Sequence, residues 1–74
     1  MKEAATIKFR DSETGDEAVA IVRYDKRHIA LCLSVKSNGD VEVVMGAVEA
    51  RKLLEALAKA LRQGSDATSF SKPR

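Results

Sequence analysis

His28 and Cys32 are the single histidine and the single cysteine of this 74-residue sequence, and such a pair could act as a nucleophile and its base. That chemistry needs hydrogen-bond contact between the two side chains. Both residues fall in a stretch whose apolar and polar positions alternate, which predicts a strand, and four strand residues at about 3.3 Å each span about 13 Å. The spacing excludes catalysis by this pair within one chain. We interpret Cys32 as a small apolar residue of a sheet.

Clustered carboxylates in the segment 11–17 could hold a calcium ion. They are Asp11, Glu13, Asp16 and Glu17. The EF-hand loop requires a glycine at its sixth position and a helix on either side, whereas Gly15 is fifth here and strand-like segments flank the loop. We therefore interpret the segment as a solvated acidic turn and expect no metal site.

No other motif in the sequence predicts a reaction. The segment 37–40, Ser-Asn-Gly-Asp, has the composition of a turn, and no helix begins directly after it, so it does not resemble a phosphate-binding loop. The sequence also lacks paired acids with the separation used in glycoside hydrolysis, zinc-ligand spacing and a nucleotide fingerprint. We expect a protein that is not an enzyme, with no catalytic residues and no cofactor.

Composition limits the class of protein further. A mass of 8.1 kDa is enough for one small domain, and 45% hydrophobic with 32% charged residues predicts a chain that folds. The net charge of +2 is too small for phosphate neutralisation to supply most of a binding affinity. A lone cysteine and the lack of an apolar run typical of a signal peptide or membrane span predict a cytoplasmic protein without membrane association.

The hydrophobic pattern predicts four strands followed by one helix. Alternating or short β-branched runs predict strands over 4–10, 18–24, 28–36 and 41–45. Helical spacing predicts a helix over 47–63, with Gly46 before it and Gly64 after it. Its apolar stripe consists of Ala50, Leu53, Leu54, Leu57 and Leu61. We expect a single α+β domain over 1–64, a four-stranded antiparallel meander with the helix packed on one face, and a flexible tail over 65–74.

Pairing between the strands can be predicted because a one-residue slip exchanges the two faces of a strand. A loop of even length about residues 26–27 pairs Tyr24 with Ile29. A three-residue loop over 37–39 pairs Val35 with Val41. These registers gather one continuous apolar face, which we expect the helix to cover. The placement of the first strand stays open.

The opposite, outer face of the sheet is also partly apolar. Its predicted members are Val19, Ile21, Arg23, Ala30, Cys32, Ser34 and Val44. A sheet face left to water is normally polar, and one helix cannot cover both sides. Either the first strand or the tail with Phe70 folds across this face, or the apolar patch is too small to need cover, or a second molecule covers it. We predict an interface with a second copy of the chain or with another protein, since a two-fold contact uses one surface twice.

Nucleic-acid binding is the alternative. Four strands followed by a helix is the element order of dimeric single-stranded DNA-binding domains such as those of transcriptional coactivators, and this resemblance implies a basic sheet on whose aromatic side chains bases stack. The candidate basic patch consists of Lys8, Arg10, Arg23, Lys26, Arg27, His28 and Lys36. Aromatic residues are few, and we expect Tyr24 on the helix side and Phe70 in the tail.

The sequence thus predicts a small interaction module that binds protein, most simply as a homodimer through its outer sheet face. In its size and its lack of catalytic or metal motifs the chain also resembles the accessory or inhibitor proteins of phages and mobile elements. That resemblance implies a protein that acts by occluding a partner surface.

Overall fold

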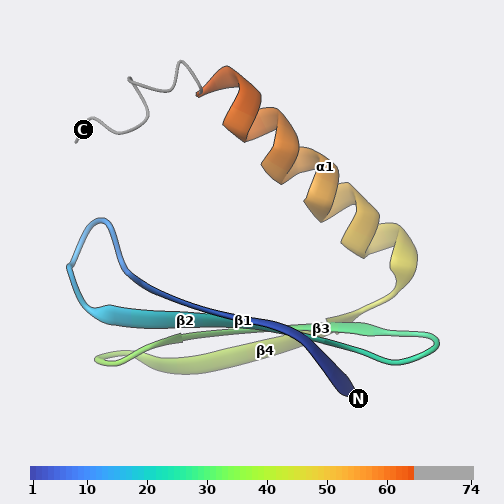
Figure 1. Ribbon diagram of the computed structural model, residues 1–74, viewed down its shortest axis with the longest axis horizontal. Coiled ribbons are helices and arrows are strands. Elements are labelled where there is room, and N and C mark those ends of the chain that lie inside the picture. The colour runs from blue at the N-terminus through green and yellow to red at the C-terminus, as the bar shows by residue number, and fades with distance from the viewer. Residues whose placement is uncertain (65–74) are drawn as a thin grey trace.

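A computed structural model describes residues 1–64 of the chain. Four strands precede one helix: β1 (Lys2–Arg10), β2 (Glu17–Tyr24), β3 (Ile29–Val35), β4 (Gly39–Met45) and α1 (Ala47–Gln63) (Figure 1). The strands form one antiparallel sheet in the order β1-β2-β3-β4. The structure therefore confirms a small α+β domain in which a four-stranded antiparallel meander is followed by a C-terminal helix. The predicted tail, including Phe70, lies outside the described residues.

The first strand extends the sheet and does not fold across it. β1 pairs along β2, with an irregularity between Glu3 and Ala5. The acidic turn that joins the two strands is held by Asp11, whose Oδ1 accepts a hydrogen bond from the backbone N–H of Glu13 at 2.8 Å. The carbonyl of Asp11 accepts from Gly15, which has a φ of +80°. At least one of the clustered carboxylates thus organises the turn itself.

The hairpins differ in how well their register was predicted. Tyr24 pairs with Ile29 as expected. The prediction for β3 and β4 is wrong by two residues, because Val35 pairs with Gly39 and not with Val41. In the turn, the N–H of Asn38 donates to the carbonyl of Val35 at 3.0 Å, and Gly39 follows with a φ of +82°. A shift of two keeps every side chain on its predicted face, so hydrophobic patterning could not distinguish the two registers.

One face of the sheet carries apolar side chains throughout, except for Lys2, which pairs with Tyr24 at one corner, and we call it the apolar face. Alternation along the paired strands places the following residues on it: Ala5, Ile7, Phe9, Ala18, Ala20, Val22, Tyr24, Ile29, Leu31, Leu33, Val35, Val41, Val43 and Met45. This is the face that the sequence predicts the helix to cover.

The helix has the predicted bounds and favourable ends. The N–H of Ala50 donates to the carbonyl of Gly46 at 3.0 Å, and the N–H of Gly64 donates to the carbonyl of Ala60 at 2.8 Å. Glu49 lies in the first turn and Arg62 in the last, where their charges complement the helix dipole.

The packing of the helix differs from the expectation. Figure 1 shows α1 leaving the end of β4 and rising away from the sheet, and its few contacts with the sheet are chiefly with β4. No residue of α1 is buried. Among residues 1–64 the only buried apolar residues are Ala18 and Ala30. A single chain therefore has two apolar layers and no closed core between them.

Candidate interaction surfaces

The apolar face is most exposed along its two edge strands. Ile7 and Phe9 of β1 are 53% and 48% exposed, and Val41 and Val43 of β4 are 57% and 52% exposed. Four strands about 4.8 Å apart and seven residues at about 3.3 Å each give this face a footprint of about 450 Å². The largest contiguous apolar patch on a soluble protein is typically of this size, and it is often a functional contact surface.

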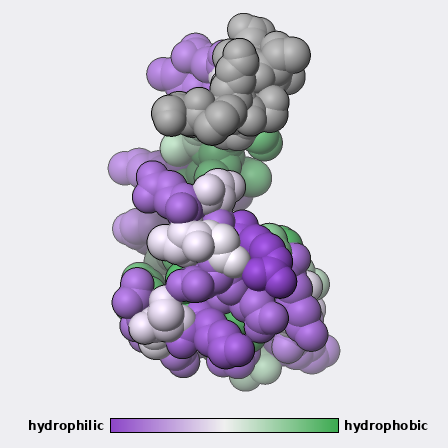
Figure 2. All heavy atoms as spheres, turned by 90° about the vertical axis from the view of Figure 1, so that its left-hand side faces the viewer, coloured by the Kyte–Doolittle hydropathy of each residue, from purple (hydrophilic) through white to green (hydrophobic). Residues whose placement is uncertain are grey.

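The helix presents a second apolar surface. Leu54, Leu57 and Leu61 of its predicted stripe are between 56% and 63% exposed. In Figure 2, which views the molecule from the end with the 11–16 and 36–38 turns, hydrophobic side chains of α1 are visible above a largely hydrophilic sheet end. In proteins most of the stability of an amphipathic helix comes from the packing of its apolar side. The stripe therefore needs a surface against which to pack.

The predicted interface residues do share the outer face. Their neighbours on that face are not all apolar. Ile21 pairs with Cys32, and Arg23 pairs with Ala30, which pairs in turn with Val44. The shifted β3–β4 register places Glu42, and not Val44, next to Cys32. Val19 and Ser34 form the remaining pair of this set.

An ion pair that the sequence analysis missed crosses the centre of the outer face. A guanidinium nitrogen of Arg23 lies 3.3 Å from a carboxylate oxygen of Glu42, so the pair spans the intervening strand β3. Ala30, between them on β3, is fully buried. Only the correct register of β4 would have shown that Glu42 is near enough to Arg23. Both side chains are about 40% exposed, and the pair makes this face more polar than the apolar face.

The candidate nucleic-acid residues do not form one patch. Lys8, Arg10 and Lys36 line a shallow hollow of about 640 Å³ at one end of the sheet, together with Glu17 and Ser34. A guanidinium nitrogen of Arg10 donates to the carbonyl of Gly15 at 2.8 Å.

The other basic candidates lie elsewhere. Lys26, Arg27 and His28 belong to the β2–β3 turn at the opposite end of the sheet, and Arg23 is paired with Glu42. The aromatic rings of Phe9 and Tyr24 are on the apolar face. Each ring nevertheless lies beside basic side chains, Phe9 with Lys8 and Arg10 at one end of the sheet and Tyr24 with Lys26 at the other. The two rings are thus at opposite ends, and the described residues form no row of aromatic side chains on which successive bases could stack.

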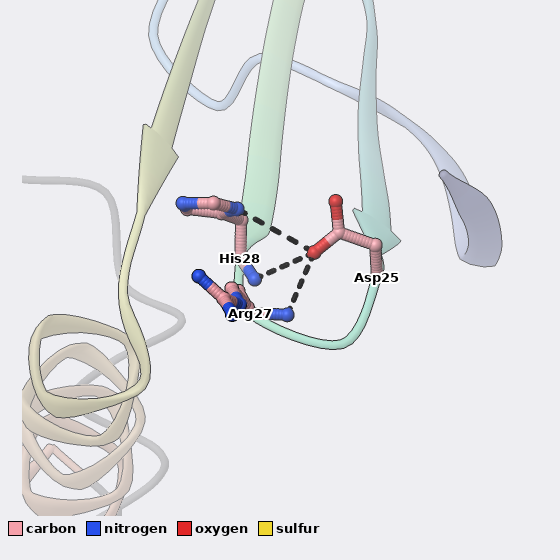
Figure 3. A network of polar contacts seen from close by, with 3 residues as sticks. All are labelled: Asp25, Arg27 and His28. Carbon is pink, nitrogen blue, oxygen red and sulfur yellow. Dashed lines mark hydrogen bonds and ion pairs between the residues drawn. The ribbon is translucent and has the colours of Figure 1, made fainter.

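His28 takes part in the turn between β2 and β3. One carboxylate oxygen of Asp25 accepts hydrogen bonds from the backbone N–H of Arg27 at 2.8 Å and of His28 at 2.7 Å (Figure 3). These two bonds hold the pKa of Asp25 below its ordinary value of 3.8. His28 Nδ1 lies 3.5 Å from the same oxygen. Cys32 lies within β3, and its thiol is free.

Two further properties concern the described part of the chain. Residues 1–64 contain no group of three or more histidine, cysteine or acidic side chains that could hold a metal ion. No helix in this range combines the length and the apolar character needed to cross a membrane.

Comparison with known proteins gives no match, whether to a protein-family model, a curated protein sequence or a solved structure.

Proposed function

We propose that this protein is a non-enzymatic, cytoplasmic protein-interaction module that acts as a homodimer, and that the two copies associate through the apolar face and the stripe of α1. The observation that carries this proposal is the simultaneous exposure of both layers. Leu57 on the helix and Val43 on the sheet are each more than half exposed, while only Ala18 and Ala30 are buried among the described residues. The unpaired thiol of Cys32 is consistent with a reducing compartment.

The area available fits a stable dimer. The 17-residue helix is about 25 Å long and about 10 Å wide, which gives a footprint of about 250 Å². Together with about 450 Å² for the apolar face, each chain offers about 700 Å². A standard interface buries about 800 Å² per partner, and permanent homodimer interfaces are also the most apolar ones.

A second copy is the partner that best matches this chemistry. Apart from Lys2 at one corner, the apolar face has no charged side chain, so it offers little to select one foreign protein from another. A domain that lacks a closed core gains much of its stability from a partner that covers its apolar surfaces. A copy of the same chain is present wherever the protein is made. In a two-fold contact the same surface of each copy forms the interface, so no second specialised surface is required.

The outer face would then be the surface that the dimer presents to other proteins. Arg23 and Glu42 give it a polar centre, and Val44 beside them is 55% exposed. A mixed surface of this kind is typical of contacts between proteins that also exist apart. The proposal therefore moves the self-association to the apolar face and leaves the predicted outer-face residues for a partner protein.

Two adjacent residues of β4 provide a matched test. Val43 lies on the apolar face and Val44 on the outer face, and they are 52% and 55% exposed. Light scattering during size-exclusion chromatography should give the wild type twice the chain mass of 8.1 kDa. Val43→Glu should give 8.1 kDa, because it buries an unpaired carboxylate in the interface, whereas Val44→Glu should remain a dimer.

The other outcomes decide against the proposal. A wild-type monomer at high micromolar concentration would exclude the homodimer. A dimer that Val44→Glu dissociates and Val43→Glu does not would place self-association on the outer face. Circular dichroism of both variants should show that the helix and sheet remain formed at the concentrations used.

A further inference from the structure

We infer that the two free edges of the sheet pair with each other between copies, so that β1 of one chain lies antiparallel to β4 of another. This contact is separate from the proposed homodimer, which buries the apolar face and the stripe of α1. It rests on the composition, the direction and the exposure of the two edge strands.

Both edge strands have backbone groups available for pairing. Within the described residues, β1 and β4 are the outer strands of the sheet, and each is paired with one neighbouring strand. The outward row of N–H and C=O groups of an edge strand is a template for another strand. Neither β1 nor β4 contains a proline that would interrupt the pairing. α1 follows β4 but rises above the sheet, so it does not run beside this edge (Figure 1).

The outer-face charges of the two edges are opposite in sign. Lys8 and Arg10 lie on the outer face of β1, and Asp40 and Glu42 lie on the outer face of β4. Opposite charges across a strand pair are stabilising, and like charges are destabilising. Pairing β1 with a second β1, or β4 with a second β4, would gather like charges, whereas pairing β1 with β4 brings opposite charges together. The charges therefore select the unlike edge as the partner.

One register satisfies both faces of the sheet at once. In the meander β4 runs opposite to β1, so a copy placed alongside in the same orientation continues the antiparallel alternation. Placing Lys8 opposite Glu42 of the other copy keeps every apolar-face residue opposite another apolar-face residue. Glu42 can serve two cations, because Arg23 contacts its Oε2 and leaves its Oε1 outside that contact. The other pairs in this register are Ala5 with Met45, Thr6 with Val44, Ile7 with Val43, Phe9 with Val41 and Arg10 with Asp40.

A single chain cannot make this contact with itself. Three strand spacings of about 4.8 Å separate β1 from β4, so the two edges of one sheet are about 14 Å apart. The apolar side chains along these edges, Ile7, Phe9, Val41 and Val43, are between 48% and 57% exposed. Among the described residues β4 is the strand in which acidic and apolar residues alternate as the β1 edge requires. The occupant that fits is therefore β4 of a second copy.

Disulfide trapping between two different chains tests this pairing. In a Cys32→Ser background, one chain carries Thr6→Cys and a second, size-tagged chain carries Val44→Cys. A disulfide spans at most about 7 Å between Cα atoms, and the inferred register places these two positions directly opposite each other. Mild oxidation of the mixture at low ionic strength, where exposed ion pairs are least screened, should give a covalent heterodimer on a non-reducing gel. Each chain alone should give no covalent dimer.

A matched control stays on the same face of β4. Asp40→Cys replaces Val44→Cys, and the two positions are four residues, or about 13 Å, apart along the strand. Asp40→Cys should therefore give little heterodimer with Thr6→Cys. Circular dichroism should show that each variant keeps its sheet and helix.

The ion pair across the edges gives a second measurement. Lys8→Glu added to the Thr6→Cys chain should remove most of the covalent heterodimer, because it places two carboxylates opposite each other. Glu42→Lys added to the Val44→Cys chain should restore it. Loss without restoration would contradict the register.

The outcomes separate edge pairing from the homodimer. A dimeric native mass of the wild type without a heterodimer bridge would overturn edge pairing and keep the homodimer. Equal bridging by Asp40→Cys, or bridging by Thr6→Cys alone, would also overturn it, because random collision or β1–β1 pairing would then explain the bridge. A native mass of 8.1 kDa at physiological salt, together with the heterodimer bridge at low salt, would exclude the homodimer and keep edge pairing.

Discussion

A single carboxylate organises the turn between β2 and β3. Asp25 accepts two backbone hydrogen bonds through one oxygen, and its own N–H donates to the carbonyl of His28 at 3.0 Å. Charged acceptors make stronger hydrogen bonds than neutral ones, so the ionised form of Asp25 is favoured in the folded state. The sequence identified this segment as a polar turn, but the way in which one side chain closes it is visible only in the structure.

This geometry predicts how the stability of the turn depends on pH. The pKa of Asp25 is lower in the folded chain than its ordinary value of 3.8, mainly because of the N–H groups of Arg27 and His28. The stabilisation is therefore complete above 3.8 and is lost as the pH falls through the lowered value. Asp25→Ala should reduce the melting temperature by a constant amount between about pH 5 and 7, and the difference should shrink below 3.8.

Asp25→Asn is the matched control, because its amide oxygen can still accept from both N–H groups but cannot ionise. Its melting temperature should lie between those of the wild type and Asp25→Ala at neutral pH and should approach the wild type in acid. A difference between wild type and Asp25→Ala that stays constant down to pH 2 would show that ionisation of Asp25 does not matter.

At the scale of elements, the β3–β4 turn depends on one backbone conformation. Gly39 has a φ of +82°, which side chains with a Cβ rarely adopt, and a Cβ placed there would meet no atom within 4 Å. The cost of Gly39→Ala should therefore come from the backbone and not from a clash. We expect about 1–2 kcal/mol lower free energy of unfolding.

Urea denaturation at one fixed protein concentration measures this cost. Gly39→Asn should lose less stability than Gly39→Ala, because asparagine tolerates the left-handed region better than other residues with a Cβ. Equal losses for both variants would contradict a backbone origin.

The same elements show which parts of the structure the sequence could predict. The bounds of α1 and the alternation along β3 and β4 follow from local periodicity, which a single sequence displays directly. The place of β1 in the sheet does not follow from it. The β3–β4 register does not, because shifting Val41 from Val35 to Leu33 leaves the hydrophobic pattern unchanged. Glu42 was consequently missed as the partner of Arg23. The direction of α1 depends on the backbone at Gly46, for which no periodic signal exists.

At the scale of the molecule, the central feature is the separation of the two apolar layers. A sheet buried on one face and an amphipathic helix normally supply each other's cover in a two-layer domain. Here the residues that would meet, such as Leu33 on β3 and Leu53 on α1, remain 44% and 38% exposed. A domain this small has a thin margin of stability even with a closed core. Folding and association should therefore be linked.

If folding is coupled to dimerisation, the melting temperature should rise with protein concentration. A tenfold increase in concentration stabilises a dimer by about 1.4 kcal/mol relative to unfolded monomers. For two chains of 74 residues this corresponds to about 3–6 °C per tenfold change in concentration. Differential scanning calorimetry or circular dichroism over a hundredfold range should show this slope for the wild type and for Val44→Glu. Val43→Glu should melt at a lower temperature that does not depend on protein concentration. A wild-type melting temperature that stays constant over the hundredfold range would mean that a single chain closes its core without a partner.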